Sequence, residues 1–233
     1  MINLNDVIFY LARFAVLLFI LPAHEFAHAF AAYKNGDYTA KFSDRYTLNP
    51  LKHFDPVGLV CFLLVGFGWA KPVPVNPYNF KNFKKGCFWV SIAGVLTNFV
   101  LAFLFYPLFL LAFYFLPKLS FIPELLTEFI LYVTYFGFAL DLSFCVFNLI
   151  PVFPLDGFRL VDTFAKKRGK VYQFLRTYGY YVLLGLILLS SVARNTPQLA
   201  SLDIFGYFMT FATDIVGYPI TAFWSFIFKL IFG

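Results

Sequence analysis

The sequence predicts an all-α polytopic membrane protein of about five transmembrane helices, with a short membrane-associated extended or β segment between the first two. Of its 233 residues, 61% are hydrophobic and only 13% are charged, which is too apolar for a soluble domain. Apolar runs long enough to cross a bilayer lie near residues 7–33, 86–116, 124–148, 172–193 and 204–231. We expect residues 1–233 to form one membrane domain.

Positive charge is concentrated in two loops. The loop after the first run holds eight Lys or Arg residues, and the loop after the third holds six. With five alternating spans, both loops and the C-terminus fall on one side, which the positive-inside rule identifies as cytoplasmic. We therefore expect the N-terminus outside and the C-terminus inside a bacterial inner membrane. The net charge of +6 is explained without a nucleic-acid partner.

The first run contains the motif His24-Glu25-x-x-His28. An ionisable side chain at membrane depth costs at least a few kcal/mol and usually faces a polar cavity or a bound ion. On a helix, positions i and i+4 share a face, so both imidazoles can bind one ion. Glu25 can then act as general base on a metal-bound water, and zinc fits these ligands best. The structural alternative is that both histidines only hydrogen-bond other helices while Glu25 pairs with a buried cation.

The end of the third run supplies the third candidate ligand. Pro151 and Pro154 must break the helix, and non-helical backbone at this depth is tolerated where it lines a cavity or is buried in protein. Asp156 therefore falls on a turn that can direct its carboxylate at an ion held by the first helix. Asn148, at the break, is expected to donate to the oxyanion or to hold substrate backbone.

Residues 57–70 are apolar, too short to cross a bilayer and too rich in glycine for a firm helix. We interpret them as a re-entrant or membrane-surface segment. Prolines at alternate positions in residues 68–77 favour extended backbone. An edge strand there could bind an unwound substrate peptide by β-augmentation. A rigid interfacial loop anchored by Trp69 is an equal alternative.

The remaining polar residues of interest receive structural roles. His53 is expected to be a solvated loop histidine, and it ranks below Asp156 as a third ligand. Asn98 is expected to hydrogen-bond across the bundle in a packing role, and Asp141 to be a buried hydrogen-bonding group. Asp203 is expected to be a packing or surface group.

Four motifs occur in order along residues 15–165: HEFAH, GWAKPVPVNP, SIAGVLTN and NLIPVFPLDG. Together they resemble the site-2 protease family of intramembrane zinc metalloproteases, of the compact type without PDZ or CBS domains. Val95 departs from the pattern, because family members often have proline after the Ala-Gly pair. The last two apolar runs carry no family motif.

The resemblance agrees with the assignments made from the residues. It implies that His24, His28 and Asp156 are zinc ligands, with one Zn2+ per chain, that Glu25 is the catalytic base and that Asn148 is an auxiliary site residue.

The predicted function is hydrolysis of peptide bonds in or near transmembrane segments of membrane proteins. The catalytic core is expected over about residues 7–165, with accessory helices over about residues 172–231 and an active site that opens toward the cytoplasm. The expected partners are a substrate transmembrane segment and the lipid bilayer, with no nucleic acid, and the sequence leaves the oligomeric state open. Two alternatives remain: a metal-ion or proton transporter using the same cluster, and a catalytically inactive relative that binds membrane proteins.

Overall fold

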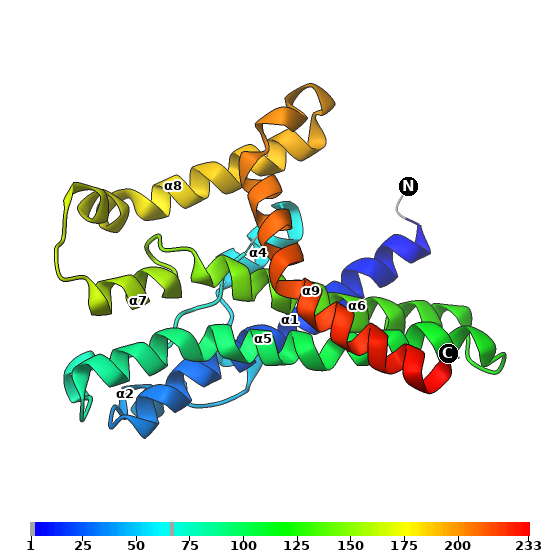
Figure 1. Ribbon diagram of the computed structural model, residues 1–233, viewed down its shortest axis with the longest axis horizontal. Helices are drawn as coiled ribbons and strands as arrows, with labels where there is room; N and C mark the ends of the chain where they lie inside the picture. The colour runs from blue at the N-terminus through cyan, green and yellow to red at the C-terminus, as the bar shows by residue number, and fades with distance from the viewer. Residues whose placement is uncertain (1–2, 66–67) are drawn as a thin grey trace.

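The computed structural model describes residues 3–65 and 68–233 and consists mainly of long helices (Figure 1). Within these residues, five helices are long and apolar enough to span a membrane. They are α1 (Leu4–Lys34), α5 (Phe83–Phe115, continued by the 3-10 turn η2, Leu116–Lys118), α6 (Glu124–Leu149), α8 (Lys170–Asn195) and α9 (Ile204–Phe232). The predicted all-α class and its five spans are confirmed, and the chain is an integral membrane protein.

Shorter elements connect these spans. Between α1 and α5 lie α2 (Thr39–Phe42), α3 (Pro50–His53), α4 (Pro56–Val65) and the 3-10 turn η1 (Pro77–Asn79). Helix α7 (Asp156–Phe164) follows α6, and the 3-10 turn η3 (Pro197–Leu202) joins α8 to α9.

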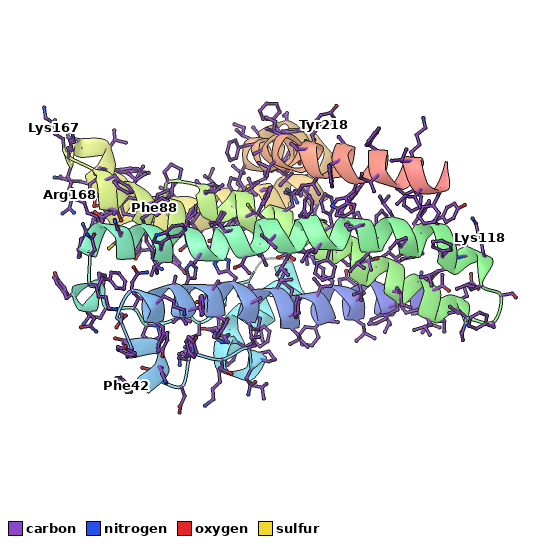
Figure 2. The ribbon with its side chains drawn as sticks, turned by 60° about the horizontal axis from the view of Figure 1, so that its bottom comes forward. Phe42, Phe88, Lys118, Lys167, Arg168 and Tyr218 are labelled. Carbon is purple, nitrogen blue, oxygen red and sulfur yellow. The ribbon has the colours of Figure 1, made fainter. Side chains whose placement is uncertain are left out.

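Helices α1, α5 and α6 form the central bundle, in which α1 and α5 run antiparallel side by side (Figure 2). Ala12, Leu17 and Ile20 of α1 pack against Phe136 of α6 in its core. Little apolar driving force exists between helices in lipid, so their association depends on close packing. Small residues such as Ala12 permit that close approach. The helix α5 is continuous through residue 95, so the valine that replaces the family's proline leaves it unbroken.

Helix α9 packs against α5 and α6 of the bundle. It also contacts α8, to which η3 joins it (Figure 1). Leu142 of α6, Ala102 of α5 and Ile220 of α9 share a second buried cluster. At the turn from α8, Asp203 caps α9 by accepting from the Gly206 amide at 2.8 Å. Arg194 at the end of α8 donates to the same carboxylate at 3.0 Å. Asp203 is thus a buried capping group that links the last two spans.

The segment between α1 and α5 differs from expectation at α4. Pro56–Val65 is helical, so the glycine content did not prevent a helix over these residues, although at 10 residues it remains too short to span. Asp55 starts the helix by accepting from the amides of Val57 and Gly58 at 2.8 and 3.1 Å, as an N-cap residue does. Residues 66 and 67 lie outside the described part of the chain.

The predicted edge strand is not confirmed. Ala70 forms an isolated antiparallel bridge with Phe54, and no sheet occurs over residues 3–65 and 68–233. The Lys71 amide donates to the His53 carbonyl at 2.7 Å, beside this bridge. The segment is therefore held against the turn after α3.

Buried Asp37 holds the far end of the same segment. Its carboxylate accepts from the Asn76 amide at 2.7 Å, from Asn79 Nδ2 at 2.8 Å and from the Thr39 amide at 3.1 Å. Burial would raise the pKa of Asp37, but these hydrogen bonds and that of the Thr39 hydroxyl hold it below its usual value. The end of α1 is thereby joined to the chain that leads into α5.

We expect Asp203→Ala to lower the stability of the purified protein by about 0.5–2 kcal/mol, the usual effect of losing an N-cap. The Arg194–Asp203 ion pair contributes little to this stability, because the Arg194 side chain is 61% exposed. Thermal unfolding in detergent measures the change, with Asp214→Ala on the exposed side of α9 as the matched control. Equal stability of the two variants would contradict the capping role.

Candidate metal centre

Three buried side chains from two distant parts of the chain converge between α1 and α7. The Nε2 atoms of His24 and His28 lie 3.0 Å apart. Asp156 Oδ2 lies 3.5 Å from the first of these nitrogens and 3.1 Å from the second. One potential ligand atom from each residue lies within 4.8 Å of the others, which is close enough for all three to share one ion. The structure thus brings together the three residues predicted as metal ligands.

Local structure explains this convergence. The two histidines occupy positions i and i+4 of α1 and therefore share a face. Helix α6 ends at Leu149, and the proline-containing turn returns the chain so that Asp156 is the first residue of α7. The chain passes close to itself at Gly157, since a Cβ there would lie 2.2 Å from the Leu149 carbonyl oxygen.

The outer nitrogens of both imidazoles face hydrogen-bond acceptors. His28 Nδ1 donates to the Val90 carbonyl at 2.7 Å, and His24 Nδ1 donates to Asn98 Oδ1. An oxygen acceptor requires the proton on Nδ1, which leaves the Nε2 lone pair of each neutral ring facing inward. Asp156 Oδ2 has no hydrogen-bond partner in the described part of the chain. Two lone pairs and a carboxylate oxygen repel one another unless a cation lies among them, and Zn2+ fits this donor set.

One face of α5 supports the cluster at spacings of four residues. Val90 accepts from His28, and Asn98, eight residues on, accepts from His24. Gly94 lies between them, and a Cβ there would come within 2.5 Å of His24 and 2.6 Å of His28. The predicted hydrogen bonding of Asn98 across the bundle is confirmed, and one of its partners is a histidine of the cluster. Gly94 and Asn98 have the same i, i+4 spacing as the two histidines. This spacing was the sequence signal that one face of α5 lies against them.

Glu25 is tied to the segment that follows α4. Its Oε2 accepts from the Val73 amide at 2.9 Å. The residue is half-buried and lines the same cavity as His24 and His28. The carboxylate predicted to be the general base is thus beside the cluster and fixed at one oxygen.

The cavity beside the cluster has a volume of about 700 Å³. Its walls come from α1, the segment after α4, the end of α6, and helices α8 and α9. Leu183, Leu184 and Ile187 of α8 are part of its lining. A volume in this range accommodates a ligand of several residues, and the apolar lining suits hydrophobic side chains.

Asn148 lines this cavity, but its Nδ2 donates to the Phe144 carbonyl of its own helix at 3.0 Å. Its contact with an oxyanion therefore stays a prediction. Sequence reasoning missed Arg159, whose Nη1 lies 3.6 Å from Asp156 Oδ1. Because the two are three residues apart at the start of α7, the i, i+3 spacing was the signal.

His53 was expected to be solvated, and this was wrong. It is 1% exposed, and its Nε2 donates to the Thr47 carbonyl at 2.7 Å. Burial lowers the pKa of His53, and nearby Arg45 lowers it further, against the opposing effect of the Thr47 hydrogen bond. The His53 carbonyl accepts the hydrogen bond from the Lys71 amide. The residue lies outside the cluster of His24, His28 and Asp156.

We expect Gly94→Ala to weaken zinc binding at least about 10-fold, because the added methyl group displaces both imidazoles from their shared orientation. Chelator competition on purified protein measures this affinity. Gly185→Ala is the matched control, since a Cβ at that position of α8 meets nothing within 4 Å. Unchanged affinity in the first variant would show that the α1–α5 contact does not shape the site.

Comparisons with known proteins agree with this geometry. The sequence model of peptidase family M50 matches residues 12–190. The chain is 41% identical over 173 residues to "Putative zinc metalloprotease YwhC" of Bacillus subtilis, an alignment that covers 73% of this chain and 77% of that protein. It is 29% identical over 150 residues to "Putative zinc metalloprotease Rip2" of Mycolicibacterium smegmatis, covering 62% of this chain and 54% of that protein.

No solved structure gives a significant match. The family model covers most of the chain, and the residues it matches include all three of the convergent cluster. The chain belongs to peptidase family M50, the site-2 protease family.

Proposed function

We propose that this protein is an intramembrane zinc endopeptidase that hydrolyses peptide bonds in or near the transmembrane segments of membrane proteins. The observation that carries the proposal is the buried convergence of two Nε2 lone pairs and one carboxylate oxygen beside Glu25. Membership of the M50 family supports a zinc metalloprotease, and the apolar character of the helix that carries both histidines supports a site at membrane depth.

His24, His28 and Asp156 would hold one Zn2+ per chain. When bound, the ion supplies Lewis acidity that makes a water molecule a stronger acid and polarises the scissile carbonyl. Two imidazoles and one carboxylate match the three protein ligands of catalytic zinc sites.

Glu25 would move the protons of the reaction. It accepts a proton from the attacking water, whose oxygen bonds to the carbonyl carbon, and returns that proton to the leaving amide nitrogen as the C–N bond breaks. The Val73 amide binds Oε2 and restricts rotation of the carboxylate, which leaves the other oxygen for proton transfer. A carboxylate held in this way is positioned before substrate arrives.

The substrate we propose is an unwound transmembrane segment, as in regulated intramembrane proteolysis. A helix uses its own backbone amides for internal hydrogen bonds, so it must open before a scissile bond reaches the cluster. The apolar α8 wall of the cavity is suited to the side chains of such a segment. Asn148 lines the same cavity and could contact substrate backbone after its hydrogen bond to Phe144 is exchanged.

The proposed orientation has the N-terminus outside and the C-terminus inside, with the site opening toward the cytoplasm. Figure 2 supports it, because Lys167 and Arg168 of the second basic loop lie at the same end of the bundle as Phe42 of the first. Lys118 lies at the opposite end. Both basic loops at one end satisfy the positive-inside rule.

We expect Glu25→Gln to retain zinc and to reduce cleavage at least about 100-fold, because the amide cannot accept the proton. The assay co-reconstitutes purified enzyme with a panel of tagged single-span membrane proteins and follows cleavage by gel. Glu124→Gln, at an exposed position in the first turn of α6, serves as the control. Wild-type cleavage by the position 25 variant would contradict the assignment of the base. Metal flux through wild-type proteoliposomes without cleavage would favour a transporter.

We expect Asp156→Ala to lose most bound zinc, because two imidazoles alone leave the ion without its anionic ligand. Metal analysis of purified protein measures zinc per chain. Asp162→Ala in the same short helix is the control, since that carboxylate pairs with Arg168 at 3.0 Å and lies outside the cluster. Equal zinc content in the two variants would remove position 156 from the site.

A further inference from the structure

A buried chain of hydrogen bonds continues behind His24, away from the metal ligands' shared space. His24 Nδ1 bonds to Asn98 Oδ1, and Asn98 Nδ2 donates to Asp141 Oδ1 at 2.7 Å. Both Asn98 and Asp141 are 0% exposed. The three residues come from α1, α5 and α6, so the chain of bonds crosses the whole central bundle.

We propose that Asp141 is a positioning residue that, through Asn98, holds His24 in the tautomer able to bind zinc and so sets the affinity of the site. This inference rests on the proposed zinc site and adds to it a residue that takes no part in the proton transfers of hydrolysis. Hydrogen-bond partners behind metal-binding imidazoles commonly tune affinity in this way.

The Asn98 side chain has two possible orientations between His24 and Asp141. An amide can turn either its oxygen or its NH2 group toward His24. If NH2 faced the ring, Nδ1 would have to accept, and the ring proton would move to Nε2. That proton would occupy the lone pair with which His24 meets His28 and Asp156, and the ligand would be lost.

Asp141 decides between these two orientations. Its Oδ1 accepts a hydrogen bond, so the Asn98 NH2 group turns toward α6 and the amide oxygen toward His24. When Asp141 is ionised, the reversed amide would place two oxygen acceptors in contact in a fully buried site, which is strongly unfavourable. The carboxylate thus acts on the imidazole through the direction of one amide.

His28 provides an internal comparison. Its Nδ1 donates to the Val90 backbone carbonyl at 2.7 Å, and a backbone carbonyl within α5 cannot reverse. Only His24 depends on a side chain that has two possible orientations. Loss of Asp141 should therefore affect His24 and leave the tautomer of His28 unchanged.

The burial of Asp141 also argues for more than packing. A carboxyl group at this depth in a membrane helix is costly. Its Oδ2 has no hydrogen-bond partner among the described residues, so Asn98 is the contact that accounts for its position. An apolar residue would join α5 to α6 at lower cost if packing were the whole role.

The first test measures zinc affinity by chelator competition on purified protein. Asn98→Ala and Asp141→Leu should each bind zinc about 10–100-fold more weakly than wild type. Thr134→Val is the matched control, because Thr134 is buried two turns earlier on α6 and donates to the Ile130 carbonyl of its own helix at 2.9 Å. Native affinity in the first two variants would overturn the proposal.

The second test exchanges the two side chains. Asn98→Asp alone keeps an oxygen acceptor toward His24 Nδ1 and should bind zinc to within a few fold of wild type. Asp141→Asn alone should be intermediate, because two amides can pair in either direction. The double variant Asn98→Asp/Asp141→Asn restores one acceptor toward His24 and one donor toward position 98, and should recover affinity to within a few fold. A double variant no better than Asp141→Asn would overturn the proposal, even if all variants fold less stably.

The third test observes the tautomer directly. The chain has three histidines, so 15N-histidine labelling of the zinc-free protein gives few NMR signals. Asp141→Leu should shift His24 from Nδ1–H toward Nε2–H, while His28 and the remote His53 stay unchanged. An unaltered His24 would overturn the proposal. Zinc binding by wild type without any cleavage would instead refute the protease function, so the two failures are distinguishable.

Discussion

The structure depends on one electrostatic constraint: two imidazole lone pairs and a carboxylate oxygen face one another in a buried space among apolar helices. Without a cation this arrangement is repulsive, and each of the three groups would be more stable exposed to water than buried here. His24, His28 and Asp156 nevertheless converge to within a few ångström of one another. The surrounding helices therefore hold together groups that a bound cation would make mutually attractive.

Helix α5 satisfies this constraint without supplying a ligand. Its Gly94 lets α1 approach until the imidazoles lie against the α5 backbone. Val90 and Asn98, one turn to either side, take the Nδ1 protons and direct both Nε2 lone pairs inward. The turn after α6 then adds the anionic group. The site is thus a product of close helix packing as much as of the ligands themselves.

Much of this could be predicted from the sequence, because the relevant signals are local. Apolar run length gives the five spans, the i, i+4 spacing gives the two histidines on one face, and the prolines after α6 give the turn that carries Asp156. Each signal depends on neighbouring residues along the chain and needs no knowledge of how helices pack.

The remaining features depend on contacts between distant residues. Asn98 and Gly94 have ordinary packing roles in most membrane helices, and only the antiparallel register of α1 and α5 places them against the imidazoles. His53 is buried because Arg45 and the segment at Lys71 close over it, which its polar neighbours in sequence do not reveal. The edge strand was not confirmed, since alternate prolines restrict backbone angles but do not supply a partner strand.

X-ray absorption spectroscopy at the zinc edge of the purified, zinc-loaded protein identifies the ligands of the ion. Coordination by His24, His28 and Asp156 predicts light-atom ligands at about 2.0–2.2 Å that include two imidazoles and a carboxylate oxygen. A sulfur ligand at about 2.3 Å, or a shell with one imidazole or none, would contradict it.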